Sequence, residues 1–454
     1  MSDTDSAGPP SDAPPPGPID RLLRPFGDVR AGEGATVLLM SFNIFLLLLA
    51  YYVLKTVREP LILLAGGAEL KSYASAFQAL TLIGYVPLYG WVAQKLPRQR
   101  FLAAIILFFV GCIQLFFLGS RMGVPHLGFI FFVWVGIFSL TMIAQFWSYA
   151  NEIYSRPEGT RLFPLIAIGS TAGAPVGAAL AEWLFGRGIN PYLMMEIAAV
   201  ILLVHLALYR VVGRRMAAAE GRPAVEPIKA GNGFAMVLKS KYLGLVALLL
   251  VLLNIVNTVG EYILGQAVVL HADAALAANA AFDKEAYVGT FYGAYFLWTN
   301  VIAILLQAFV VSRLVKRFGL AGALFALPVV ALGAYGFAAA GAALMVLRSV
   351  KIAENSTDYS VMNTAKQMLW LPTSREEKYK AKQAIDTFFV RSGDMLAAGV
   401  VFVGTHVVQA TVSGFARINI AFVLLAMVIA WLLLREYRRI TSPSEQSPLG
   451  EKVS

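Results

Sequence analysis

Charged residues are scarce in this chain of 454 residues. Asp, Glu, Lys and Arg together make up 14% of the sequence, whereas apolar residues make up 58%, and the mean hydropathy is +0.68. Soluble domains carry about 25% charged residues and about 45–50% apolar ones. The low charge content therefore excludes an ordinary soluble globular protein and indicates a membrane protein.

Cysteine and histidine are also rare. A single cysteine, Cys112, can form no internal disulfide and no metal cluster. The four histidines are scattered without the spacing of metal ligands: His126, His205, His271 and His406. The sequence contains no phosphate-binding loop, no serine–histidine–aspartate set and no cofactor fingerprint. We therefore expect no metal, no cofactor and no enzymatic activity.

Twelve apolar runs are long enough to cross a membrane as helices. A spanning helix needs about 20 mostly apolar residues, and it must be helical because lipid offers the backbone no hydrogen-bond partners. The runs are residues 36–57, 73–94, 101–119, 127–149, 162–186, 190–211, 243–269, 287–312, 318–339, 341–368, 384–411 and 414–434. The predicted fold class is all-α, a polytopic membrane protein with about twelve transmembrane helices.

A polar, basic stretch divides these runs into two sets of six. We expect residues 212–241 to be a cytoplasmic linker between an N-terminal half, 36–211, and a C-terminal half, 242–435. Residues 1–35 are expected to be a disordered cytoplasmic tail, because Met1 to about Pro18 is rich in Pro, Ser, Asp and Gly. Residues 436–454 are expected to be a cytoplasmic tail as well. Two six-helix halves predict a major-facilitator-like architecture.

Basic residues are distributed unevenly between the two sides of this topology. Of the 37 Lys and Arg residues, five fall in loops opposite the linker: Lys71, Arg121, Arg187, Lys284 and Arg417. Most of the others fall in the tails, in the linker and in the loops on its side. Because cytoplasmic loops carry an excess of Lys and Arg, we expect both termini to be cytoplasmic in a bacterial inner membrane. The net charge of +10 reflects this topology, so no nucleic-acid partner is expected.

Polar and ionisable side chains inside or at the ends of the predicted spans are the main sign of function. Each charge costs roughly 2.5–3.5 kcal/mol at bilayer depth and therefore needs a reason. We predict a substrate-binding set of twelve residues: Lys55, Arg58, Glu158, Arg161, Asn257, Glu261, Arg348, Lys351, Asp358, Lys382, Asp386 and Arg391.

Several of these residues allow a second interpretation. Lys55 and Arg58 share a helix face, which either attracts an anion or extends to water at the helix end. Glu158 and Arg161 belong either to the site or to an ion pair at the entry of the fifth span. The polar stripe of the tenth span faces either a partner helix or a water-filled cavity, and we favour the cavity.

Small residues in the fifth span have a different interpretation. They are Gly169, Ser170, Ala172, Gly173, Ala174 and Gly177. Small residues at membrane helix interfaces let backbones approach closely. We expect them to serve helix packing rather than ligand binding.

Two patches of the sequence are informative when taken together. The first patch consists of Phe146, Trp147, Ala150, Asn151, Glu158, Arg161, Phe163 and Pro164. The second consists of Tyr359, Ser360, Lys366, Met368, Leu371, Pro372, Lys378, Lys380, Lys382, Ala384, Ile385 and Asp386. Both patches, and more loosely the stretch from Leu54 to Glu69, resemble the ATP:ADP antiporter family of plastids and intracellular bacteria, the non-mitochondrial nucleotide transporters. By position, the family's functional Lys and Glu residues would be Lys55 or Arg58, Glu158, Glu261 (Asn257 in the unshifted alignment) and Lys382.

The resemblance implies a monomeric carrier in the lipid bilayer that exchanges nucleotides, or a related phosphorylated anion, by alternating access. The sequence departs from the family after Glu261, where it reads Tyr262-Ile263-Leu264-Gly265-Gln266 instead of carrying further lysines. The family's glycine-rich stretch in the eleventh helix is replaced by Arg391-Ser392-Gly393-Asp394. A carrier of a different solute, coupled to protons, is the alternative.

Overall fold

The computed structural model describes residues 17–93, 98–217 and 233–441, and within these ranges it is helical without strands. The chain divides into two compact units. Unit 1 is drawn from Met1–Leu61, Tyr89–Pro227 and Gly289–Leu297. Unit 2 is drawn from Ile62–Leu88, Ile228–Val288 and Trp298–Ser454. Each unit therefore includes a segment from the other predicted half, while the predicted boundaries of the halves and the linker stay a prediction.

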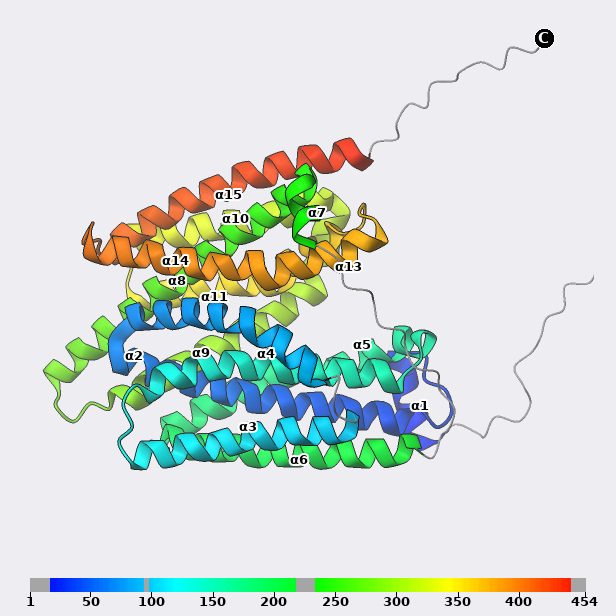
Figure 1. Cartoon of the computed structure of the whole chain (residues 1–454). Helices are drawn as coiled ribbons and strands as arrows, with labels where there is room; N and C mark the ends of the chain where they lie inside the picture. Colours follow the sequence, from blue (N-terminus) through cyan, green and yellow to red (C-terminus); the bar gives the residue numbers. More distant parts are fainter. Residues whose placement is uncertain (1–16, 94–97, 218–232, 442–454) are drawn as a thin grey trace, which may run out of the picture. The chain divides into compact units, whose positions relative to one another are not determined.

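All twelve predicted spans coincide with helical segments (Figure 1). The helices of the first half and the linker are α1 (Pro18–Leu23), α2 (Gly34–Ala93), α3 (Arg98–Arg121), α4 (Leu127–Ile153), α5 (Arg156–Gly186), α6 (Pro191–Ala217) and α7 (Gly233–Lys239). The later helices are α8 (Lys241–Ala278), α9 (Lys284–Leu305), α10 (Ser312–Ala339), α11 (Leu344–Thr357), α12 (Asn363–Met368), α13 (Arg375–Ala384), α14 (Val390–His406) and α15 (Val412–Thr441). π-Helical turns join several of them: η2 (Leu306–Val311), η3 (Asp358–Met362) and η4 (Ile385–Phe389).

Nine helices in the described ranges are long and apolar enough to cross a membrane. Two of them, Gly34–Gly90 and Lys284–Ala339, have 57 and 56 residues, more than twice the length of about 20 residues that one crossing needs. Each is bent at a glycine with positive φ, Gly67 at 69° and Gly319 at 60°, and so corresponds to two predicted spans. The remaining predicted span, 341–368, corresponds to the helical stretch 344–368, which is more polar than the others. The polytopic all-α fold is confirmed.

The first bend replaces a predicted loop. Gly66 and Gly67 alone leave helical geometry inside α2, with φ/ψ of −169°/25° and 69°/−169°. Helix resumes at once, because glycine adopts a positive φ without steric cost. Our assignment of Lys71 to a loop is therefore wrong, since Lys71 lies inside the helix and is buried.

The N-terminal segment is ordered where we predicted disorder. The Asp20 carboxylate accepts hydrogen bonds from the backbone N–H groups of Gly17 (2.8 Å), Gly32 (3.0 Å) and Gly34 (2.8 Å). These contacts fold the chain from α1 to the start of α2 into one loop. The predicted tail 1–35 is therefore wrong for residues 17–33, because one buried carboxylate satisfies three backbone donors. Residues 1–16 lie outside the described residues.

The described ends of the predicted linker are helical. Helix α6 continues to Ala217, and α7 packs against α13 in unit 2. The packing is close, because a Cβ atom at Gly233 would lie 2.2 Å from the carbonyl oxygen of Lys380. Residues 218–232 of the linker and 442–454 of the C-terminal tail lie outside the described residues.

The small residues of α5 pack against α2, as predicted. Cβ atoms built at Gly169, Gly173 and Gly177 would lie 1.8, 2.4 and 2.5 Å from backbone oxygens of α2, those of Ser41, Phe45 and Leu49 respectively. Both series advance by four residues, so the two helices run parallel in close contact. Any larger side chain at these glycines would push the helices apart.

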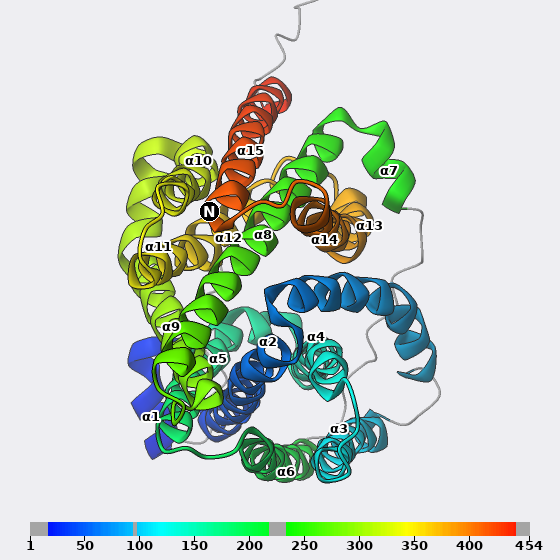
Figure 2. The same ribbon diagram turned by 90° about the vertical axis from the view of Figure 1, so that its left-hand side faces the viewer.

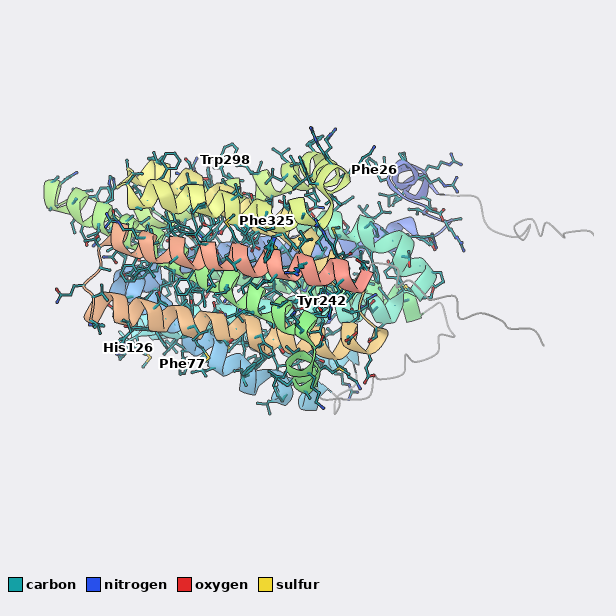
Figure 3. All side chains as sticks on the ribbon, turned by 90° about the horizontal axis from the view of Figure 1, so that it is seen from above. Phe26, Phe77, His126, Tyr242, Trp298 and Phe325 are labelled. Carbon is teal, nitrogen blue, oxygen red and sulfur yellow. The ribbon has the colours of Figure 1, made fainter. Side chains whose placement is uncertain are left out.

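Large apolar side chains cover the outside of the helices. Phe77 and Trp298 of unit 2, for example, are 51% and 50% exposed (Figure 3). In unit 1, Phe108 and Leu115 of α3 are exposed to a similar degree. Such a surface is expected of helices that face lipid rather than water.

Replacing Gly169 with alanine should destabilise unit 1, because the added methyl group has no space beside α2. Overpacking costs roughly 1–3 kcal/mol, which the thermal unfolding midpoint of the purified protein would register. Gly186→Ala is the matched control, since no atom lies within 4 Å of the position that its methyl group would take. Equal midpoints for the two variants would contradict the packing role.

Asp20→Asn should release the loop formed by residues 17–34. The N–H groups of Gly32, Gly34 and Gly17 hold the pKa of Asp20 below its usual value of 3.8. A lowered pKa means that the loop is fully stabilised above pH 3.8 and loses this contribution as the pH falls through the folded-state pKa.

A spin label at exposed Phe26, in a Cys112→Ala background, would measure this release. The label should become mobile at acid pH in the parent and already be mobile at pH 7 in Asp20→Asn. Asp28→Asn, whose side chain is 71% exposed, is the control and should leave the label immobile. A label that is equally immobile in Asp20→Asn at pH 7 would refute the role of Asp20.

Candidate functional site

Two lysines and two glutamates form a largely buried charge cluster in unit 2. Lys71 Nζ lies 3.3 Å from Glu261 Oε2, and Lys351 Nζ lies 3.1 Å from Glu354 Oε2. Lys351 Nζ is also 4.0 Å from Glu261 Oε1, so the two pairs are linked. The second segment of α2, α8 and α11 each contribute to the cluster. With all four groups ionised, its net charge is zero.

Neutral side chains complete the charge cluster. The Tyr335 hydroxyl donates to the Glu354 carboxylate, 2.7 and 2.8 Å from its two oxygens. Lys351 donates to Asn257 Oδ1 at 2.9 Å, and Asn355 donates to Glu261 at 3.1 Å. Lys351 is 4% exposed and Glu354 2%, so these partners replace the hydration that both charges lose on burial.

A glycine on α8 makes room for the cluster. A Cβ atom at Gly260 would lie 2.0 Å from the Tyr335 hydroxyl oxygen and 2.8 Å from Lys351 Nζ. Both side chains therefore approach the backbone of α8 only because residue 260 has no side chain. The adjoining cavity of about 10 Å³ has space for one water molecule at most.

The tenth predicted span thus differs from our favoured interpretation. Lys351 and Asn355 lie buried against α8 and do not line a water-filled cavity, so the partner-helix alternative holds for them. The reason is that α8 carries complementary groups, Asn257 and Glu261, at the same level. Arg348, one turn earlier on α11, is half-buried.

A second polar group lies slightly earlier on α8, towards its N-terminus. Asp394 of α14 accepts hydrogen bonds from Asn254 at 2.8 Å and from Thr258 at 2.9 Å. Arg391 lies 3.5 Å from the same carboxylate. Arg391 is therefore paired within its own helix.

The other predicted residues of unit 2 lie at two π-helical turns. Asp358 opens η3 and pairs with Lys366 at 3.1 Å. Asp386 lies in η4, within electrostatic range of Lys382 and Lys366, and Lys382 donates to Gln367 at 3.0 Å. π-Helical turns inside α-helices frequently occur at functional sites.

In unit 1, the two predicted cations on α2 contact aromatic rings. Lys55 Nζ lies 4.3 Å from the ring centroid of Phe296. The Arg58 guanidinium lies 4.1 Å from that of Phe132 and 2.7 Å from the fully buried Glu59. Cation–π contacts and an adjacent carboxylate compensate the lost hydration. The Arg58 side chain is only 14% exposed, so it does not simply extend to water.

Glu158 and Arg161 lie at the other end of the α2–α5 pair. Glu158 accepts from the Ser155 N–H at the start of α5, and Arg161 pairs with Glu33 at 2.9 Å. Glu33, the partner of Arg161, lies directly before α2 and precedes Arg58 by about 25 residues, which corresponds to roughly 37 Å of helix at 1.5 Å per residue. The structure therefore does not bring these two residues together with the α2 cations, and their contacts serve the helix entry and the N-terminal loop.

Sequence reasoning leaves four ionisable members of these clusters out of the predicted site: Lys71, Glu354, Asp394 and Tyr335. It assigns Lys71 to a loop, although a connection of two glycines leaves no loop to hold it. Glu354 lies three residues after Lys351, a spacing that indicates a pair. Asp394 stands three residues after Arg391 in the same way. For Tyr335 the sequence holds no signal, because nothing distinguishes it from other aromatic residues of the ninth span.

Solved structures with the same arrangement of helices are membrane transporters. The nucleoside transporter NupG matches with a TM-score of 0.66 at 13% identity, covering 89% of this chain and 99% of that chain. A bacterial homologue of the iron transporter ferroportin in the inward-facing state matches with a TM-score of 0.63 at 14% identity, covering 88% and 98%. The fold is that of a major-facilitator-like transporter.

Sequence comparison gives the particular family. The model of the TLC ATP/ADP transporter family matches residues 128–341 and 331–437. ADP,ATP carrier protein 1 of Chlamydia muridarum is 23% identical, covering 90% of both chains. ADP,ATP carrier protein 1 of Rickettsia bellii is 21% identical, covering 94% of this chain and 98% of the relative. The chain belongs to the TLC ATP/ADP transporter family, which confirms the resemblance drawn from the sequence.

Lys351→Met should destabilise unit 2 by about 3–5 kcal/mol, because it leaves Glu354 buried without its cation. Adding Glu354→Gln should recover much of this loss, since the amide carries no charge. The four thermal midpoints of this double-mutant cycle measure the coupling.

Lys284→Met is the matched control, because its partner Asp273 is 53% exposed and exposed pairs contribute about 0–1 kcal/mol. Additive effects of the Lys351 and Glu354 changes would show that the pair is not coupled.

Proposed function

We propose that this protein is a secondary carrier that exchanges nucleotides of the ATP/ADP type, or a related phosphorylated anion, by alternating access. Family membership supports the nucleotide. The observation that carries the mechanism is the charge cluster of Lys71, Glu261, Lys351 and Glu354, in which lysines are neutralised by internal carboxylates. The carrier would act as a monomer in a bacterial inner membrane, with both termini cytoplasmic and without enzymatic turnover.

The two carboxylates would have different roles in exchange. Glu354 is buried and held by Tyr335 as well as Lys351, so it would fix the position of Lys351. The Glu261 side chain is 19% exposed and lies at 3.3 and 4.0 Å from the two lysines. Its longer, weaker contacts make Glu261 the group that a phosphate would replace, because phosphate oxygens form stronger charge-assisted hydrogen bonds with lysine.

This replacement would explain coupled exchange. When a nucleotide leaves, Glu261 returns to the lysines and restores the neutral cluster. Two partly uncompensated lysines at membrane depth would otherwise be costly. Moving between the two access states would then be favourable with substrate bound and slow in the empty carrier, which is the behaviour of an antiporter.

Cations outside the charge cluster are proposed as further substrate contacts. Lys55 and Arg58 would attract phosphates from the N-terminal half, with the adjacent rings of Tyr52 and Phe296 available for stacking on a base. Lys382 would contact the substrate phosphates from the C-terminal half. Asn257, Arg348, Asp358, Asp386 and Arg391 are proposed to orient these cations.

A proton-coupled carrier of another solute is the second candidate. The observation that favours it is the unbroken series of titratable groups from Tyr335 through Glu354, Lys351 and Glu261 to Lys71. Linked ionisable groups inside a membrane are typical of proton relays. Uptake that collapses with a protonophore and ignores internal ADP would favour this candidate.

The direct test is uptake of radiolabelled ATP into proteoliposomes loaded with ADP. Wild-type uptake should depend on internal ADP. Lys71→Ala should lower uptake about tenfold to a hundredfold, as expected for the loss of a charged hydrogen bond to the substrate. Lys382→Ala and Arg58→Ala should lower it as well.

Lys284→Ala, which removes a partly exposed lysine outside the charge cluster, should exchange normally. Size-exclusion profiles would confirm that every variant is folded. If the Lys71, Lys382 and Arg58 variants exchanged every nucleotide tested at the wild-type rate, the proposed site would be refuted. Absence of ADP-dependent uptake in the wild type would refute the function.

A further inference from the structure

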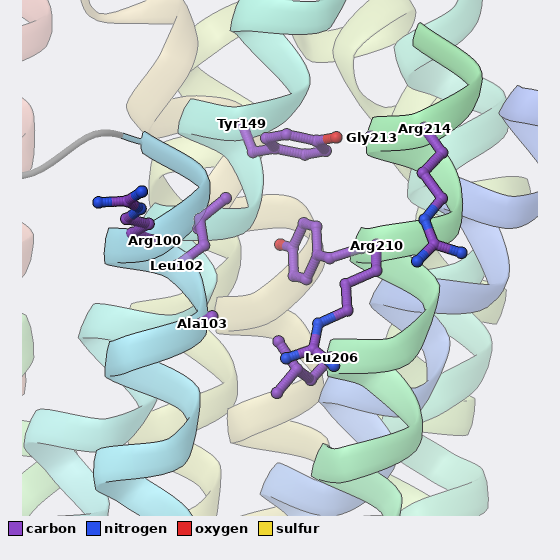
Figure 4. A pocket seen from close by; sticks show the side chains of 9 residues that line it. Arg100, Leu102, Ala103, Tyr149, Leu206, Arg210, Gly213 and Arg214 are labelled. Atoms are coloured by element: carbon purple, nitrogen blue, oxygen red, sulfur yellow. The ribbon is translucent and has the colours of Figure 1, made fainter. Parts of the chain in front are cut away.

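We propose that a cleft in unit 1, between the start of α3 and the end of α6, binds the phosphate headgroup of an anionic membrane phospholipid. This site is separate from the charge cluster and would act on the protein from its lipid-facing surface. The cleft has a volume of about 320 Å³. Its polar lining comes from Arg100, Arg210, Arg214 and two tyrosines (Figure 4).

The arginines stand on both walls of the cleft. Arg210 and Arg214 lie one turn apart on α6, and Arg100 lies opposite on the first turn of α3 (Figure 4). Helices α3 and α6 pack side by side, as Figures 1 and 2 show. Tyr149 and Tyr209 form the inner wall, with their rings in edge contact at 4.9 Å. Arg210 and Arg214 thus form a basic wall on α6, and Arg100 lies at the rim on α3 with its guanidinium directed away from Arg210 in this view (Figure 4).

The three arginines have no acidic partner in the part of the chain that the structure describes, where neither an ion pair nor a hydrogen bond is found for them. Other arginines of the protein are neutralised, such as Arg161 by Glu33. Three unpaired cations around one cleft repel each other, and a bound anion would relieve this repulsion. Arginine matches the geometry of a phosphate with two parallel N–H donors.

The level of the cleft along the helices is that of lipid headgroups. Arg100 directly precedes the third predicted span, and Arg210 lies at the end of the sixth. Both positions fall on the side to which the sequence assigns its basic loops, and anionic lipids on the cytoplasmic side attract basic groups at this depth. The residues therefore lie where a phosphodiester would be found.

The surface below the cleft is suited to acyl chains. Towards the membrane centre, α3 exposes Leu107 and Phe108 to 48% and 64%, and α6 exposes Leu203 and Val204 to 42% and 46%. A soluble phosphate would use the arginines but none of this apolar surface. A phospholipid would use both, which is why the geometry favours a lipid over a soluble anion.

Native mass spectrometry of the purified full-length protein in detergent would test this site. Wild type should retain phosphatidylglycerol in preference to phosphatidylcholine, and Arg210→Gln/Arg214→Gln should reduce this preference roughly tenfold. Arg210→Lys/Arg214→Lys should retain most of it. Arg313→Gln/Arg317→Gln, with the same spacing on α10 and exposed side chains, is the matched control and should resemble wild type.

A second arm separates lipid from soluble phosphate. Glycerol phosphate or ADP at millimolar concentration should not displace the retained phosphatidylglycerol. Displacement by either would show that the cleft takes a soluble phosphate and would overturn the proposal. Equal phosphatidylglycerol preference in wild type and in Arg210→Gln/Arg214→Gln would overturn it as well. Because nucleotide exchange is measured separately, failure here leaves the proposed function intact.

Discussion

Lys351 and Glu354 lie one turn apart on α11 and are almost fully removed from solvent. Each charge can be buried there only because the opposite charge of the other residue compensates it. The surroundings cannot hydrate a charge, so the pair needs further hydrogen-bond donors and acceptors. Tyr335 and Asn257 provide them from α10 and α8. This requirement fixes how α11 packs against its neighbours, and through Glu261 it extends to Lys71 on α2.

Backbone geometry adapts to this cluster at several points. The bend at Gly66 and Gly67 turns α2 so that its second segment belongs to unit 2 and carries Lys71 to Glu261. Gly260 removes the side chain that would otherwise meet Tyr335 and Lys351. In both cases glycine is used because the position needs either a positive φ or close approach.

Charge neutralisation also applies to two further polar groups in the helices. Asp394 is surrounded by Arg391, Asn254 and Thr258, and Arg58 is paired with Glu59. Substrate phosphates would enter a protein whose inward-facing cations already have partners. Exchange of one anionic partner for another is physically less costly than exposing a bare cation, and this links the architecture to antiport.

The sequence by itself determined the class of the protein, its twelve helical spans and, through two patches of resemblance, its family. These features depend on hydrophobicity and local spacing, which neighbouring residues in the chain carry. The cation–carboxylate pairs within one helix were accessible in the same way, as for Lys351 with Glu354.

Only the tertiary structure decided which of these groups meet. Lys71 and Glu261 are 190 residues apart, and Tyr335 reaches Glu354 from another helix. It also separated Glu158 and Arg161 from the α2 cations of the same unit and ordered residues 17–33 around Asp20. Spacing along a chain defines the face of one helix, whereas contacts between helices depend on bends and on small residues that permit close approach.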